Sequence, residues 1–398
     1  MGNKKFKSTC PLINKRKLKN EKVVEGNITA FGLLKYKNKE FILTGFYCAG
    51  FSSSKIEIYD SLNLEKVANI RNIDSNYVRY IGQLKDNYFT AACMKNISIY
   101  LFYEEKNNKE NISVYNIKLV QKIINIDNYY YLSLLKAILF DRNLYRENDI
   151  YEIEKKENEK IVNKNYKTNI TIGDELIISS SGGIFLFNKK NEEDRKQNID
   201  EIKEDIDIDT SLEKWKKNPF EYKKNLTNSI YVYDMIQINY KYLAGTIDDY
   251  LCLISMETYE IITKFKVKVS KNCDSIMFML NDDILCMGGD DSITLISIKN
   301  FEILSETIIK SQQLITEICI LPDFNILIGM KNYKDNKEYF YQYKYIYSYN
   351  KSKKKMEYYI AKGTTKLLTR NNSNIMMRCL MEDRLATILD LKIIQIWE

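Results

Sequence analysis

The stretch "NYKYLAGTIDDYLCLISMETYEII" (residues 239–262) has a counterpart 42 residues further along the chain, "NDDILCMGGDDSITLISIKNFEIL" (residues 281–304). At that offset Asp248 aligns with Asp290, Leu253 with Leu295 and Glu260 with Glu302. Self-similarity at a fixed period of this size is typical of repeat proteins, in which one supersecondary unit is stacked on its neighbours. The chain is therefore expected to consist of successive copies of one small unit.

Each copy has an apolar strand, a short Asp or Gly turn, a strand of alternating apolar residues, and a further strand after another polar turn. Tight turns between strands of four to seven residues predict antiparallel hairpins. The rule finds eight hairpins, the weakest of them at 129–141. Their second strands begin near residues 56, 97, 137, 184, 251, 293, 340 and 393.

The spacing and two strand endings, Ile58-Tyr59-Asp60 and Ile396-Trp397-Glu398, resemble the WD-repeat β-propeller family, which uses about 40 to 45 residues for each four-stranded blade. The resemblance extends over residues 21–398, although the family's Gly-His pair is missing. It implies an all-β fold, a single propeller of four-stranded antiparallel blades. Seven or eight blades fit, with eight counted.

The two ends of the chain predict how such a propeller closes. The last unit stops at its third strand, "IIQIWE" (residues 393–398), and would leave an exposed sheet edge. The stretch "KVVEG" (residues 22–26) precedes the first unit and is the expected N-terminal strand beside it. The family resemblance implies the same closure.

The Gly-Gly-Asp-Asp sequence at 288–291 could be a metal-binding motif or a turn. Its counterpart, Asp248-Asp249, occupies the equivalent turn one unit earlier, and Asp and Gly are favoured in tight turns. A catalytic Gly-Asp-Asp would need further carboxylates and a nucleotide site, neither of which the sequence reveals. The turn is the preferred interpretation.

The composition excludes several kinds of chemistry. The chain of 398 residues contains no histidine, so imidazole bases and histidine-bound metals are excluded. Its eight cysteines form no Cys-x-x-Cys pair and are expected to be reduced core residues of a cytoplasmic protein, with the nucleus as the alternative. We expect no enzyme activity, no catalytic residue, no cofactor, no metal and no small-molecule substrate.

The positive charge is concentrated at the N-terminus. Residues 1–22 hold eight basic residues and one acidic residue, which account for the whole net charge of +7. Residues 1–20 are expected to be a flexible basic tail, although targeting, phosphate binding and lipidation stay open. No apolar run approaches the roughly 18 residues that span a bilayer, so no stable membrane insertion is expected.

Two stretches depart from the repeat. A charged insertion at about 189–226 contains Trp215 and Phe220, which are either part of a disordered loop or anchors for a partner. Six alternating tyrosines between 339 and 349 share one strand face and include Tyr341, Tyr343 and Tyr345. They precede a lysine run. The candidate contact residues of that run are Lys353, Lys354 and Lys355.

The tyrosine face is interpreted first as packing between blades, because tyrosines fill that space, and second as a platform for stacking bases. The sequence accordingly predicts a non-enzymatic scaffold for other proteins, as a subunit of a larger complex. The alternative is an RNA-associated propeller that uses the basic tail and the tyrosine strand.

Overall fold

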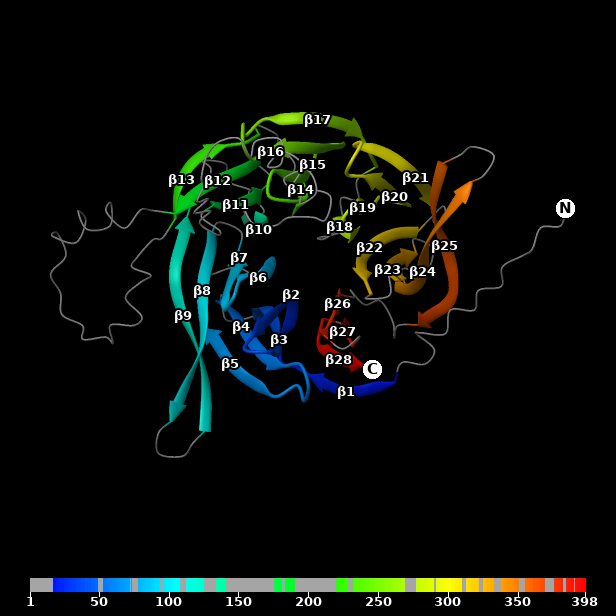
Figure 1. The fold of residues 1–398 in the computed structure, drawn as a ribbon. Helices are drawn as coiled ribbons and strands as arrows, with labels where there is room; N and C mark the ends of the chain where they lie inside the picture. The colour runs from blue at the N-terminus through cyan, green and yellow to red at the C-terminus, as the bar shows by residue number, and fades with distance from the viewer. Residues whose placement is uncertain are drawn as a thin grey trace, which may run out of the picture. The chain divides into compact units, whose positions relative to one another are not determined.

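The computed structural model describes twenty stretches of the chain. They are residues 17–48, 53–71, 73, 78–93, 96–107, 112–124, 134–140, 175–180, 183–189, 220–227, 232–268, 277–289, 291–309, 313–321, 325–332, 338–350, 355–368, 376–381, 384–389 and 391–398. All 28 elements found in them are β-strands, and no α-helix occurs in these stretches. The strands form seven four-stranded sheets. The fold is an antiparallel β-propeller, and each sheet is one blade, as the strand arrows of Figure 1 show.

Contacts divide the chain into two compact units, which are described separately. The first comprises 29–59 and 66–265, and the second comprises 1–28, 60–65 and 266–398.

Four blades belong to the first unit, and in each the strands pair in sequence order. Their strands are β2 (Asn27–Tyr36), β3 (Lys39–Cys48), β4 (Ser53–Asp60) and β5 (Lys66–Arg71); β6 (Tyr80–Lys85), β7 (Tyr88–Ala92), β8 (Asn96–Asn107) and β9 (Ile112–Ile124); β10 (Leu134–Phe140), β11 (Glu175–Ser180), β12 (Gly183–Lys189) and β13 (Phe220–Asn225); β14 (Val232–Gln237), β15 (Tyr242–Ile247), β16 (Tyr250–Ser255) and β17 (Ile261–Lys266).

Three blades belong to the second unit, and the last of them combines both ends of the chain. Their strands are β18 (Met277–Asn281), β19 (Ile284–Gly288), β20 (Ser292–Ser297) and β21 (Glu302–Ile308); β22 (Gln313–Ile320), β23 (Asn325–Asn332), β24 (Glu338–Asn350) and β25 (Lys355–Leu368); β26 (Met376–Cys379), β27 (Leu385–Leu389), β28 (Ile393–Trp397) and β1 (Leu18–Val23).

The cores lie between neighbouring blades within each unit. One apolar cluster joins the β2–β5 and β6–β9 blades, a second joins β6–β9 to β10–β13, and a third joins β10–β13 to β14–β17. In the second unit, clusters join the β18–β21 and β22–β25 blades, and the latter to the last blade. Both faces of these central strands are therefore buried, which explains the nearly continuous burial along β16, β19 and β20.

The predicted closure by the N-terminal strand is confirmed. β1 pairs antiparallel with β28, with Leu18 opposite Trp397 and Val23 opposite Ile393. The strand begins at Leu18, before the expected "KVVEG" stretch, so residues 18–20 belong to the blade, whereas residues 1–16 of the expected basic tail lie outside the described residues. Lys22 and Asn20 donate side-chain hydrogen bonds to carbonyl oxygens of the β4–β5 loop, which belongs to the same unit. β1 itself has no buried residue, so this edge is closed mainly by backbone and polar contacts.

The described residues form seven blades, the lower of the two predicted numbers, so the prediction of seven or eight blades is confirmed and the hairpin count of eight is one too many. The described part of the predicted hairpin at 129–141 is one strand, β10, which pairs with β11 in the same blade. In the sequence these two strands resemble separate units because residues 141–174 lie between them. The charged insertion at about 189–226 begins at the end of β12 in that blade. Its residues 220–225 are β13, the fourth strand of the same blade, so the segment interrupts a blade rather than linking two.

Candidate interaction surfaces

Two hairpins extend beyond the sheets to which they belong. In the second unit, β23 pairs with β24 from Glu338 to Lys344, whereas Tyr345–Asn350 pairs with Lys355–Ile360 of β25. We call this two-stranded extension the β24–β25 arm. In the first unit, β7 pairs with β8 up to Leu101, and Tyr103–Asn107 pairs with Ile112–Asn116 of β9. This is the β8–β9 arm, and both arms run past the other strands of their sheets in Figure 1.

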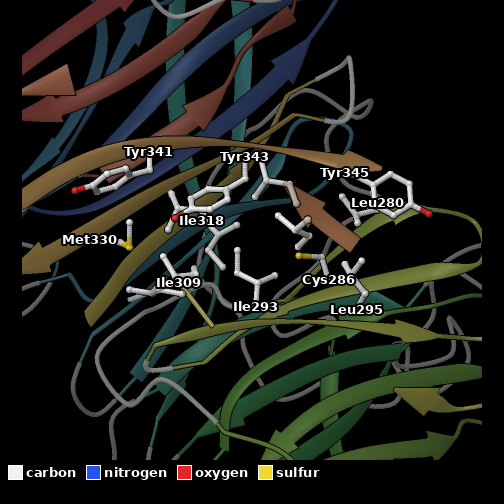
Figure 2. Close-up of a cluster of buried hydrophobic side chains, with 14 of the residues drawn as sticks. Leu280, Cys286, Ile293, Leu295, Ile309, Ile318, Met330, Tyr341, Tyr343 and Tyr345 are labelled. Carbon is white, nitrogen blue, oxygen red and sulfur yellow. The ribbon is translucent and has the colours of Figure 1, made fainter. Parts of the chain in front are cut away.

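The base of the β24–β25 arm is fixed by the alternating tyrosines. Tyr341, Tyr343 and Tyr345 are buried and point into the cluster between the β18–β21 and β22–β25 blades, as Figure 2 shows. The Tyr345 ring stacks on Tyr358 of β25, with centroids 6.3 Å apart. Lys344, on the opposite face of the strand, is exposed. The structure thus supports the first interpretation of the tyrosine face, as packing between blades.

The other predicted contact residues are placed as follows. Lys355 begins β25, and its side chain, like Lys353, Lys354 and Trp215, lies outside the described residues. Phe220 begins β13 and is buried. Its backbone N–H donates to Gln121 Oε1 at 3.0 Å, and its carbonyl accepts from Gln121 Nε2 at 2.9 Å. Phe220 is therefore a core residue that connects two blades.

The base of the β8–β9 arm is an aromatic cluster that the sequence pattern missed. Phe102 and Tyr115 face each other across the arm with ring centroids 5.3 Å apart, and Phe41 of the neighbouring blade meets both rings edge-on. Lys39 Nζ donates to the Tyr115 hydroxyl at 2.9 Å. Aromatic residues from three different strands come together here. Phe41 is more than sixty residues from the other two in the sequence, and no local pattern connects it to them.

Polar chemistry inside the first unit centres on Glu57 of β4. The carboxylate is buried and accepts hydrogen bonds from Tyr59, from Lys55 at 3.0 Å and from Lys66 at 3.3 Å. Burial alone raises the pKa of Glu57, but the bonds from Tyr59 and Lys55 outweigh it and hold the pKa below its ordinary value. Burial and the same bond raise the pKa of Tyr59. The carboxylate therefore has three hydrogen-bond donors, and the one from Lys66 links β4 to β5.

The Gly-Asp-Asp stretch is a turn in its described part. Asp291 lies in the connection between β19 and β20, which the Gly289 N–H closes by donating to the Ser292 carbonyl, and Asp248-Asp249 forms the two-residue turn between β15 and β16. Asp248 has φ of 53°, the left-handed region that short polar side chains tolerate. In the described stretches, no group of three or more cysteine and acidic side chains is placed to hold a metal ion.

Comparison with known proteins gives a likeness of fold. A solved structure entitled "Crystal Structure of Mitotic Checkpoint Complex" contains a chain that is 10% identical, with a TM-score of 0.57 over 96% of this chain and 94% of that chain. No protein-family profile matches the sequence. No curated protein matches it either. Within the described stretches, no helix has the length and apolar character needed to cross a bilayer.

Proposed function

We propose that this chain is a non-enzymatic scaffold that binds other proteins, as a subunit of a larger complex in the cytoplasm, with the nucleus as the alternative location. The observation that carries the proposal is the pair of arms, because each extends a hairpin past the sheet that would otherwise cover its edges. The solved chain with a similar fold is part of the mitotic checkpoint complex, which is consistent with a role for this protein as a subunit of a complex.

The arms provide a physical basis for binding. A two-stranded hairpin is marginally stable by itself in water, and both arms are held in place by clusters at their bases. Beyond those bases, the β24 and β8 edges have no third strand of their own sheet beside them in the described residues. An unpaired strand edge is a template for an extended segment of another chain, whose main-chain groups complete the ladder. The arms therefore suit protein partners that add a strand.

The RNA alternative loses part of its support. It used the basic tail, of which residues 1–16 lie outside the described residues, and a tyrosine face open to bases; on that face Tyr341, Tyr343 and Tyr345 are 7%, 2% and 8% exposed. Buried rings offer no free surface for stacking. Cys252, Cys286 and Cys319 are buried thiols that form no disulfide among the described residues, which is consistent with the proposed reducing compartment.

The test shortens one arm at a time. In the first variant, residues 348–357 are replaced by Asn-Gly, which joins Tyr347 to Tyr358, opposite each other in the register. The matched variant replaces 106–113 by Asn-Gly and joins Glu105 to Val114. Both keep the clusters at the bases, so both should fold with unchanged circular dichroism.

Tagged wild-type and shortened chains are then purified from their native cells, with and without nuclease and at two salt concentrations. We expect wild-type to retain protein partners after nuclease treatment and in moderate salt, and at least one partner to be lost with each shortened arm. Retention of every partner by both variants would remove the arms as the binding surface. Complete loss of partners with nuclease would contradict the scaffold and favour RNA.

A further inference from the structure

Strand β13 contains a β-bulge that brings two consecutive lysines to one ring. Leu186 of β12 lies opposite Lys224 and Phe187 lies opposite Tyr222, so Lys223 is the extra residue. In a regular strand, consecutive side chains point to opposite faces, whereas a bulge re-aims them. As a result, Lys223 Nζ lies 4.4 Å and Lys224 Nζ lies 5.1 Å from the centroid of the Tyr259 ring.

The same bulge recurs between the third and fourth strands of three other blades, where its extra residue is apolar. These residues are Val67 in β5, Val120 in β9 and Leu304 in β21. Each is partly buried against the cluster between its blade and a neighbour. Lys223 is exposed, so the β10–β13 blade departs from a pattern set by packing. A charged residue at this position has no role in the core.

Tyr259 is held in a fixed position by the turn between β16 and β17. Its N–H donates to the Ser255 carbonyl at 2.8 Å, and its φ of 60° lies in the left-handed region. The equivalent turn residues of two other blades, Leu64 and Phe301, share that φ and are apolar. The Tyr259 hydroxyl donates to buried Glu175 at 2.5 Å and accepts from Lys223 at 3.1 Å. The hydroxyl is thus held by Glu175 on one side and Lys223 on the other, which fixes the ring.

The two ammonium groups lack an acidic partner among the described residues. Among the described residues, Lys223 and Lys224 contact Tyr259, and the Glu175 carboxylate is bound to the Tyr259 hydroxyl. The pKa of Lys241 is raised by a hydrogen bond to Tyr240 and, as a smaller cause, by the carboxylate of Glu257, in the same turn as Tyr259, which attracts the Lys241 ammonium group. Two like charges held over one ring repel each other, and an anion between them would remove that repulsion and form charge-assisted hydrogen bonds.

We propose that Lys223, Lys224 and Tyr259 form a recognition site for an acidic segment of a partner protein, whose carboxylates lie between the two ammonium groups. The inference rests on the proposed scaffold function and names the chemistry of one partner. A protein segment is favoured over RNA because the Tyr259 ring already has lysines over it and its hydroxyl is bonded, which leaves the ring unavailable for base stacking.

The test titrates purified full-length protein into fluorescein-labelled octaglutamate at low salt, with fluorescence anisotropy as the readout. The test variant is Lys223→Glu/Lys224→Glu. The matched control is Lys118→Glu/Lys122→Glu, which makes the same charge change at two exposed positions on β9, a fourth strand of the same unit. We expect binding to weaken by about tenfold or more in the test variant and by less than about twofold in the control.

Several outcomes would overturn the site. They are unchanged binding in the test variant, equal weakening in the control, or displacement of the peptide by an oligouridine probe that binds as tightly and with the same lysine dependence. If charge reversal prevents folding, Lys223→Met/Lys224→Met supplies the same comparison without added negative charge. Because the titration uses purified protein and a synthetic probe, its result is independent of the capture of cellular partners that tests the scaffold.

Discussion

Two buried tyrosines, each in the third strand of its blade, should respond in opposite ways to replacement by phenylalanine. Tyr59 in β4 and Tyr343 in β24 are each 2% exposed. The Tyr59 hydroxyl donates to Glu57, whereas the Tyr343 hydroxyl has no hydrogen-bond partner among the described residues. Burial raises the pKa of both phenols, so each keeps its proton at neutral pH. Replacement by phenylalanine removes one oxygen and keeps the ring in both places.

The structure gives the sign and the size of each effect. A buried hydroxyl without a partner costs about 1–3 kcal/mol, so Tyr343→Phe should raise the free energy of unfolding by about 1–2 kcal/mol. A hydrogen bond to a charged group contributes about 1.5–3 kcal/mol. Glu57 keeps Lys55 and Lys66 as donors, so Tyr59→Phe should lower the free energy of unfolding by about 1.5–2 kcal/mol.

Thermal unfolding followed by circular dichroism measures both variants against wild-type. At roughly 2 °C for each kcal/mol in a chain of this size, Tm should rise by roughly 2–4 °C for Tyr343→Phe and fall by a similar amount for Tyr59→Phe. A fall of Tm in the Tyr343→Phe variant would show that its hydroxyl is satisfied in solution. In that case the buried-hydroxyl argument, and the close packing of the tyrosine face that it assumes, would be wrong.

Further predictions concern close packing and pH. Gly32→Ala should lower the free energy of unfolding by more than about 2 kcal/mol, because its new Cβ would lie 2.4 Å from the Ile81 carbonyl oxygen, a backbone atom that cannot move aside. Gly245→Ala is the control, since the nearest atom to its Cβ is the flexible end of Ile184 at 3.1 Å and the next atoms are at ordinary contact distance; an equal loss in both would contradict this reasoning. Because the folded-state pKa of Glu57 is depressed, its carboxylate stabilises the fold above the ordinary value of 4.5, and that contribution is lost as pH falls below it. The gap in unfolding free energy between wild-type and Glu57→Gln, measured by urea titration, should therefore shrink from pH 7 to pH 4, and a constant gap would show that Glu57 carries no such linkage.

Short-range patterns in the sequence predicted much of the architecture. The 42-residue self-similarity required repeated hairpins, and paired aspartates at 248–249 and 290–291 required turns at equivalent positions. Six alternating tyrosines specified one strand face, and an incomplete last unit required a strand from elsewhere in the chain. Each of these follows from period-two alternation or from the need to satisfy a sheet edge, which act over a few residues.

The blade count and the contact residues were decided by tertiary structure. A strand such as β10 is assigned to its blade by pairing with β11 across 34 intervening residues, and no local pattern records that pairing. Phe220 had the character of an exposed anchor in sequence, but Gln121 on another blade holds it in the core. Lys223, Lys224 and Tyr259 meet only because a bulge rotates one strand and a neighbouring blade supplies the ring. Sequence determines which face of a strand is apolar, whereas the partner opposite that face is determined by how distant segments pack.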